Sequence, residues 1–484
     1  MISRLIAAAV WFVTMGSVYA QPDSLWSRTY GGMTGDDCVK AGHTSDGGYF
    51  LVGTSASYGT DFSQDFWLVK TDDRGDSLWS RNYGGAYTDA CRDGIHTTDG
   101  GYLLVGETWS FGSEWGDAWI IKVDVNGDSI WSRVFGSDSF DAFYAIQQTS
   151  DGGYILGGYS HAPDTGYPGL WIVKIDANGE HLWDALFGTN YEYCKAIYQT
   201  DDGGYVLGGT TSVRGSGGTD FWLIRADAEG GELWNRTFGG YADEICYSVR
   251  QTHDGGFIMA GSTNSFGSGG QNYWLVKTDS NGDSLWSRAY GLSGRESCNS
   301  VIQTADNGYV MIGYTWSIGA GDRDCWLIRT DTEGNVLWDK TFGGSDADFG
   351  VSVEQAEGGN YIVGGLTWSF GAGSTDYWLI KTGPDPIVDT DARDVALPNS
   401  ISLSIFPNPF NPTATISFSL PYQAQTSLEV YNVLGQAVYS VDMGQLPAGN
   451  YHHLLDAASL PSGTYLTQLN AGEMQEVKKM AVVR

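Results

Sequence analysis

The sequence predicts an all-β protein, in which a seven-bladed β-propeller closed by its own N-terminal strand is followed by a small Ig-like β-sandwich. The first observation is a pair of tryptophans that recurs seven times in steps of 51 to 53 residues. The second is that each period holds four short apolar runs separated by Gly- and Asp-rich turns. A fixed period of about this length is typical of a β-propeller, in which each repeat forms one four-stranded blade. The two series are Trp26, Trp79, Trp131, Trp183, Trp234, Trp286, Trp338 and Trp67, Trp119, Trp171, Trp222, Trp274, Trp326, Trp378.

The clearest copy of the repeat shows the four runs, which we name a to d. They are Cys246–Thr252, Phe257–Gly261, Tyr273–Thr278 and Ser284–Tyr290. Runs of five to seven residues rich in aromatic and β-branched side chains predict strands, and they are too short for a helix with an apolar stripe. Each repeat is therefore expected to form an antiparallel meander.

The order of the runs predicts how the ring closes. The repeat array opens on a d run, Ser24–Tyr30, and ends on a c run, Tyr377–Thr382, with no d run after it. Because an unpaired strand edge is a liability, we expect the N-terminal d strand to complete the last blade beside that c strand.

Composition defines the rest of the organisation. Met1–Ala20 has the charge, apolar core and small-residue cleavage site of a signal peptide, and no other apolar run is long enough to span a bilayer. We expect the propeller over 21–382, a Pro- and Asp-rich linker over 383–396 and the second domain over 397–484. The net charge of −31 argues against nucleic acid and anionic membrane surfaces as partners. The mature chain is expected to be an exported monomer.

Six cysteines in an exported chain first suggest disulfides, but their spacing does not. Five occupy one repeat position, which Phe143 and Gly350 occupy in the other two copies: Cys38, Cys91, Cys194, Cys246 and Cys298. Cys325 lies two strands away from Cys298 in the same blade, too far for a bridge. The sequence predicts free, buried thiols.

The b–c and d–a connections are long and leave the same face of the ring, which we name the loop face. Beyond Trp11 of the predicted signal peptide, subtracting the repeat leaves four tryptophans, all in b–c connections: Trp109, Trp115, Trp316 and Trp368. Exposed aromatic rings can stack on sugars or seat apolar groups of a partner, so these are candidate binding residues. The alternative, which we favour, is that each indole folds onto its own loop. His161 and Tyr167, in the divergent b–c connection of blade 3, are further candidates.

An acidic residue precedes run a in every repeat. If run a lies nearest the axis, these carboxylates ring the channel mouth and could bind calcium. The structural alternative, which we favour because every blade has one, is that each accepts hydrogen bonds from a loop or a neighbouring blade. No other metal site is predicted. The residues are Asp36, Asp89, Asp141, Glu192, Glu244, Glu296 and Asp348.

The sequence holds no catalytic motif that stands apart from the repeat. We therefore favour a non-enzymatic binding or adhesion module with a glycan or protein ligand. The alternative is a carbohydrate-active enzyme, a glycosidase or lyase, with its site at the channel mouth. A coat or adhesion role without a small ligand also stays open.

The tail has no tryptophan and its short apolar runs alternate, which predicts seven strands in a small β-sandwich. Its motifs resemble the type A C-terminal sorting domain of the type IX secretion system. They are Phe406–Pro412 (FPNPFNP), Val430–Gln436 (VYNVLGQ), Leu460–Tyr465 (LPSGTY) and Lys478–Met480 (KKM). The resemblance implies recognition by that machinery, export across the outer membrane of a Bacteroidetes-like bacterium, tail removal, and release or surface attachment. The repeats also resemble secreted bacterial propeller repeats, a likeness that implies no activity.

Overall fold

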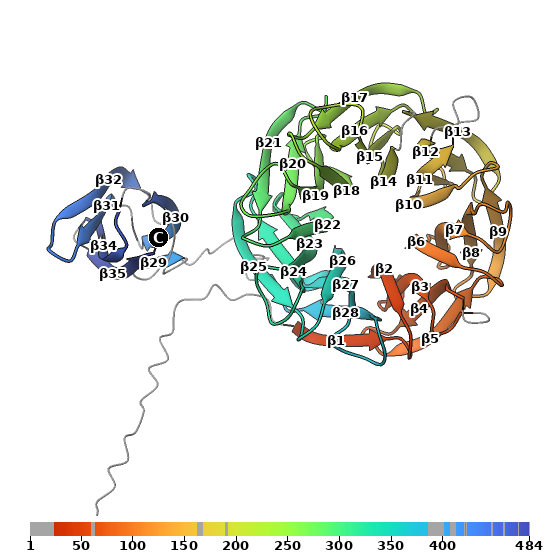
Figure 1. The fold of residues 1–484 in the computed structure, drawn as a ribbon, viewed down its shortest axis with the longest axis horizontal. Helices are drawn as coiled ribbons and strands as arrows, with labels where there is room; N and C mark the ends of the chain where they lie inside the picture. Colours follow the sequence, from red (N-terminus) through yellow and green to blue (C-terminus); the bar gives the residue numbers. More distant parts are fainter. Residues whose placement is uncertain are drawn as a thin grey trace, which may run out of the picture. The chain divides into compact units, whose positions relative to one another are not determined.

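The computed structural model describes residues 24–59, 63–161, 168–188 and 192–385 of the repeat region. In the tail it describes 401–406, 413–420, 422, 424–446, 449–457, 460–472 and 474–483. The predicted signal peptide and most of the predicted linker lie outside these ranges. Within them, seven four-stranded antiparallel sheets are arranged in a ring, and a separate pair of sheets follows (Figure 1). The predicted fold class is confirmed.

Each blade contributes one strand to each of four concentric layers. The innermost, a strands are β2 (Asp36–His43), β6 (Asp89–His96), β10 (Ala142–Gln148), β14 (Tyr193–Gln199), β18 (Glu244–Gln251), β22 (Glu296–Gln303) and β26 (Asp348–Gln355). The b strands are β3 (Tyr49–Ser55), β7 (Tyr102–Thr108), β11 (Tyr154–His161), β15 (Tyr205–Thr211), β19 (Phe257–Thr263), β23 (Tyr309–Thr315) and β27 (Tyr361–Thr367).

The c strands are β4 (Asp65–Thr71), β8 (Asp117–Val123), β12 (Pro168–Ile175), β16 (Asp220–Ala226), β20 (Asn272–Thr278), β24 (Asp324–Thr330) and β28 (Asp376–Thr382). The outer, d strands are β1 (Ser24–Tyr30), β5 (Ser77–Tyr83), β9 (Ser129–Phe135), β13 (His181–Phe187), β17 (Glu232–Phe238), β21 (Ser284–Tyr290) and β25 (Val336–Phe342). A single 3₁₀ turn, η2 (Glu357–Gly359), connects β26 to β27.

The burial of the strands follows from the stacking of blades. Strands b and c are covered on both faces by neighbouring blades, so nearly every residue in them is buried. The outer strands alternate between exposed and partly buried side chains, because one face looks to solvent. The hydrophobic core is therefore a series of clusters between adjacent blades rather than one central core.

The first strand of the array belongs to the last blade. β1 pairs antiparallel with β28, with Ser27 opposite Ile380 and Tyr30 opposite Tyr377, and the sheet order is β1-β28-β27-β26. On the other side β2 packs against β26, β27 and β28. The predicted strand exchange is thus present as backbone pairing.

Neighbouring blades are joined by the outer tryptophan. Gly75, in the c–d turn of blade 1, has a φ of +77°, and a Cβ there would come within 2.7 Å of the Trp26 ring. The same contact joins Trp79 to Gly127 and Trp234 to Gly282. A glycine at this turn thus serves both the positive φ and the close approach of the indole.

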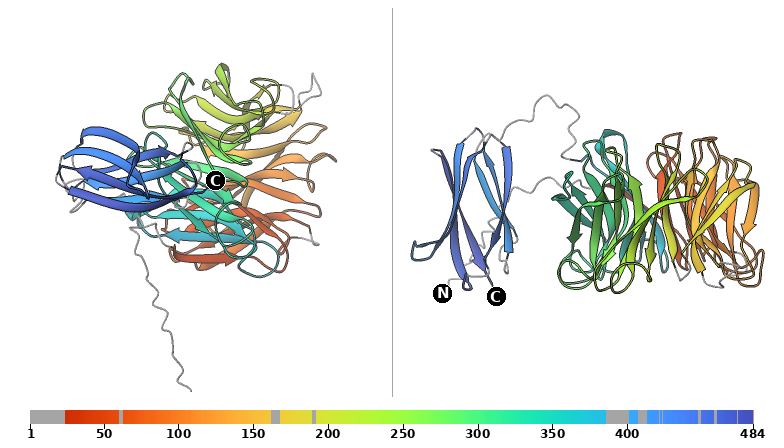
Figure 2. Two further views of the ribbon diagram at one scale, coloured as in Figure 1. Left: turned by 60° about the vertical axis from the view of Figure 1, so that its left-hand side comes forward. Right: turned by 90° about the horizontal axis from the view of Figure 1, so that it is seen from above.

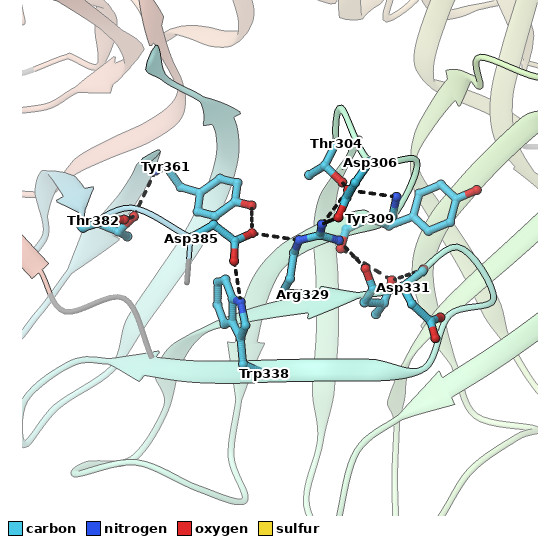
Figure 3. Close-up of polar contacts among 12 residues, drawn as sticks. Thr304, Asp306, Tyr309, Arg329, Asp331, Trp338, Tyr361, Thr382 and Asp385 are labelled. Carbon is cyan, nitrogen blue, oxygen red and sulfur yellow. Dashed lines mark hydrogen bonds and ion pairs between the residues drawn. The ribbon is translucent and has the colours of Figure 1, made fainter. Parts of the chain in front are cut away.

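The last blade has no c–d turn, since its outer strand comes from the N-terminus. In its place the segment after β28 packs back on the ring, and the buried Asp385 carboxylate accepts from Trp338 Nε1 at 3.0 Å, Tyr361 Oη at 2.6 Å and Arg329 Nε at 2.9 Å (Figure 3). Gly383–Asp385, which the composition assigned to a linker, therefore packs with the propeller. The chain divides into two compact units, one of Gln21–Val388 and one that contains Asp389–Arg484.

All six cysteines are free and buried, as predicted. The tail forms a β-sandwich with the seven predicted strands, β29 (Ser402–Phe406), β30 (Thr413–Leu420), β31 (Ala424–Asn432), β32 (Ala437–Leu446), β33 (Gly449–Asp456), β34 (Gly463–Ala471) and β35 (Met474–Val482). Its sheets, β29-β30-β33 and β32-β31-β34-β35, face each other in two layers (Figure 2). Over the described residues no helix is long and apolar enough to cross a bilayer.

Candidate functional site

A cavity of about 530 Å³ lies where the central channel opens on the loop face. This volume falls in the range of small-molecule binding sites. The a strands of all seven blades contribute to its wall, together with the end of β27 and the loop that follows it. The cavity therefore lies at the place where the sequence predicted a channel mouth.

One position in each blade supplies most of the wall. It is the third residue after the acidic position, and the residues are Val39, Arg92, Tyr144, Lys195, Tyr247, Asn299 and Val351. Six of the seven pairs of neighbouring blades differ here, and the exception is Val351 beside Val39, where the last blade meets the first. The position directly before it holds Cys in five of the seven blades.

A β-bulge explains why this position points into the channel. In blade 4, Cys194 pairs with Gly209 and Ala196 pairs with Gly208, so Lys195 has no partner across the ladder. The register shifts at the same place in every a strand. An inserted residue of this kind re-aims its side chain. The repeat thus builds a rigid ring of seven side chains whose identities are free to vary.

The cationic part of the wall comes from blades 2 and 4. Arg92 forms a bidentate pair with the buried Glu107 carboxylate, with Nε 2.9 Å from Oε2 and a further bond from Nη2 to Oε1. The Lys195 ammonium lies 3.6 Å from the centroid of the Tyr144 ring. Burial, reinforced by the Arg92 charge, lowers the pKa of Lys195 to about 8.

The remaining wall contains both polar and aromatic side chains. Asn299 donates its amide to Gly350 O at 2.8 Å, and Thr375 Oγ1 donates to Asp37 Oδ1 at 3.0 Å. Burial raises the pKa of the Asp37 carboxyl, although the hydrogen bond from Thr375 opposes the shift. Trp368 and Phe349 complete the rim, with ring centroids 5.6 Å apart.

The loop tryptophans are each partly exposed and each packed against a neighbour. Trp109 lies 6.2 Å from Phe140, and Trp316 lies under the Arg323 guanidinium at 4.4 Å. Their exposed fractions, with that of Trp368, are 41 to 45%, and that of Trp115 is 63%. Of the four, only Trp368 lines the cavity.

Of the two candidate binding residues in blade 3, only His161 lies within the described residues. The His161 ring packs beside Tyr159 at 5.6 Å, and its Nδ1 lies 3.2 Å from Phe140 O. Tyr167 lies outside the described residues. His161 occupies the same repeat position as Trp109, Trp316 and Trp368, but it is the last residue of its b strand, whereas the three tryptophans directly follow theirs.

The acidic ring is fully buried rather than open to the channel. Asp89 is representative: Oδ2 accepts from Gly85 N and Ser110 Oγ at 2.8 Å each, and Oδ1 accepts from Thr108 Oγ1. Asp36, Glu244, Glu296 and Asp348 bind the equivalent backbone N–H and hydroxyl groups. Asp141 accepts from Ser137 N and Oγ, and Glu192 accepts from Thr211 Oγ1. Over the described residues no group of three His, Cys, Asp or Glu side chains is placed to hold a metal ion.

Sequence subtraction missed the bulge residues. The signal was present, because a position inside a regular strand that changes chemical class from blade to blade is not needed for the blade itself. The position lies within a strand, whereas variation that marks a binding site is expected in loops.

Comparison with known proteins identifies the tail. Residues 404–483 match the secretion system C-terminal sorting domain family. The regulatory protein FlaEY of Caulobacter vibrioides is 26% identical over 300 residues, which cover 51% of this chain and 30% of that protein.

Among solved structures, PorZ, a surface component of the type IX secretion system of Porphyromonas gingivalis, matches at 12% identity and a TM-score of 0.42. The match covers 94% of this chain and 60% of PorZ. The Neurospora crassa Pan2 WD40 domain matches at 10% identity and a TM-score of 0.45, covering 72% of this chain and 90% of that domain.

Proposed function

Because the chain carries a type IX sorting domain and is therefore exported to the cell surface or beyond, we propose that its propeller is a non-enzymatic binding module. The proposed site is the cavity at the loop-face mouth of the channel. One observation carries the proposal: the seven residues that the bulge turns into the cavity are of five different types, apolar, aromatic, polar and cationic, whereas the scaffold around them repeats. Variation confined to one concave surface of a repetitive scaffold is typical of a binding site.

The aromatic rim supports a ligand with a flat or apolar face. Trp368 and Phe349 border the cavity, and the partly exposed Trp109 and Trp316 lie in the b–c loops of blades 2 and 6. Glycan and protein ligands both present such faces, and an array of immobilised glycans and surface proteins tests both on the full chain.

We expect binding that is lost or at least tenfold weaker when Trp368 is replaced by Ala, because a rim aromatic ring is an energetic anchor. The matched control is Trp115→Ala, which removes an indole that is more exposed and lies outside the cavity wall. Equal binding by wild type and Trp368→Ala would contradict the proposed site.

One observation favours the second candidate, a carbohydrate-active enzyme. A lysine with a pKa of about 8 over the ring of a tyrosine could serve as a general base near neutral pH. Incubating each bound glycan with the protein and analysing the products by mass spectrometry separates the two: intact glycan supports a binding module, and chain cleavage supports the enzyme.

A further inference from the structure

The Lys195 side chain is the cation of the cavity wall that has no anionic partner within the described residues. It lies on the bulge of β14, its ammonium faces the Tyr144 ring at 3.6 Å, and the Tyr193 ring centroid is 5.8 Å away. No hydrogen bond or ion pair of Lys195 occurs among the residues that the structure describes. A cation held among aromatic rings without a counter-ion is a position for the anion of a ligand.

Arg92 does not fill this role. Its guanidinium is held by the buried Glu107 carboxylate through both Nε and Nη2, so the charge of that pair is balanced inside the protein. Lys195 is therefore the cation of the wall without an ion pair among the described residues. The carboxyl that also lines the wall, Asp37, accepts from Thr375 Oγ1, and burial raises its pKa. A single cation matches a carboxylate or a sulfate ester better than a phosphate monoester, whose second charge would lack a partner.

The rest of the wall fits a sugar ring. Trp368 and Phe349 offer aromatic rings to an apolar sugar face, and the wall also contains the polar side chains of Tyr144, Tyr247 and Asn299. The net charge of −31 on the whole chain repels extended polyanions at long range. A mostly neutral glycan with an occasional acidic unit avoids that repulsion.

We propose that the cavity binds a singly charged acidic sugar unit, with its carboxylate or sulfate on the Lys195 ammonium and its ring against Trp368. This inference rests on the proposed function and names the chemistry of its ligand. An acidic peptide side chain would use the same cation but leave the polar edge contacts unused, and it is one outcome of the test.

The test uses the full chain and matched methyl glycosides of glucose, galactose and mannose, each as the neutral sugar, the uronate and the 6-sulfate. Binding is measured by saturation-transfer NMR and by competition. We expect at least one acidic probe to bind about tenfold or more tightly than its neutral parent. The uronate and sulfate arms show which anion is preferred.

Variants separate this inference from the proposed function. Lys195→Met is expected to remove the preference for the acidic probe, and Lys195→Arg to retain part of it. Arg28→Met, which removes an exposed cation of the outer strand, is the control and should change nothing. Thermal unfolding of each variant shows that it is folded.

The pH dependence gives a second readout. The groups that face Lys195 are Arg92, Glu107, Tyr144, Tyr193 and Cys194. Burial raises the pKa of Tyr144 and of Cys194 to about 12, so neither changes charge below pH 10. Affinity for the acidic probe should therefore fall several-fold between pH 7 and about pH 10 as Lys195 loses its proton, and affinity for neutral sugars should not.

Each possible outcome of these experiments supports or contradicts one of the two proposals. If no acidic probe binds better than its neutral parent, or if Lys195→Met keeps the preference, the inference is wrong. If a neutral glycan or a protein binds through Trp368 without Lys195, the proposed function stands and the acidic ligand does not. If an acidic peptide alone binds through Lys195, the glycan assignment is wrong. If nothing binds and Trp368→Ala has no effect in any assay, both proposals fail.

Discussion

Asp385 shows how a single residue completes a ring whose last repeat is unfinished. In the other blades the outer tryptophan packs on the glycine of the next c–d turn, as Trp286 does on Gly334. Trp338 has no such turn beside it, and Asp385 accepts its indole N–H instead (Figure 3). The same carboxylate pairs with Arg329, and both side chains of this ion pair are fully buried. The charge of Arg329 is thus compensated in part from beyond the last strand.

We expect Asp385→Ala to lower the free energy of unfolding by about 3–5 kcal/mol, because it leaves a buried guanidinium short of a partner. Urea denaturation measures the loss. The control is Asp76→Asn, which breaks an exposed pair with Arg28 and should cost less than about 1 kcal/mol. Equal effects of the two substitutions would show that Asp306, the other carboxylate on Arg329, suffices alone.

At the scale of the element, the a–b hairpin is stabilised by one repeated ion pair. Lys70 Nζ donates to Asp46 Oδ1 at 2.9 Å and to Thr44 Oγ1 at 3.0 Å, and Thr44 Oγ1 donates to Asp46 as well. Burial opposes ionisation of Asp46, but the hydrogen bonds from Thr44, Lys70 and Gly48 outweigh it and lower its pKa to about 2. The corresponding pairs in blades 2, 3 and 5 behave alike.

The sign of the pH dependence follows from this lowered pKa. An aspartate titrates near pH 4 in the unfolded chain, so its contribution is complete above pH 4 and is lost as pH falls through about 2. Wild type should therefore be more stable than Asp46→Asn at pH 6, by no more than about 1 kcal/mol because the carboxylate is half exposed. The difference should shrink towards zero near pH 2. Denaturation of both proteins across this range measures it, and a constant difference would contradict the assignment.

At the scale of the whole molecule, the propeller and the tail are separate packing units. Their cores are distinct clusters, one series between blades and one between the two sheets of the sandwich. We expect a variant that ends at Val388 to unfold at the same midpoint as the propeller transition of the full chain. Calorimetry measures both.

Removing Ser24–Tyr30 from that shorter variant is the matched comparison. It takes the partner from β28 and leaves a buried strand as an open edge, so we expect the cooperative transition to be lost or shifted down by more than about 10 °C. An unchanged midpoint would mean that the N-terminal strand contributes little to the ring.

Most of the architecture can be predicted from the sequence, because the same pattern of residues occurs seven times. Seven copies of one pattern average out the noise of any single strand assignment, so the strands, the pairing of Ser24–Tyr30 with Tyr377–Thr382 and the free thiols all follow from periodicity. The sorting tail can be predicted for a different reason: its family motifs occur in order over its whole length.

Only part of the candidate site can be predicted from the sequence. Trp368 was found because it departs from the repeat, and it does line the cavity. Lys195, Arg92 and Tyr144 were not predicted. The variation of their position is visible in the sequence, but the bulge between Cys194 and Ala196, which turns one residue of a regular strand towards the axis, is not.

By itself the sequence determined the number of blades, the order of their strands and the export of the chain, since each depends on patterns that repeat or on contiguous motifs. Only the tertiary structure decided which side chains share the channel and that Asp385 sits against Arg329 and Trp338. Those contacts join residues that are far apart in the sequence. The closed ring of blades, and not their separation along the chain, brings them together.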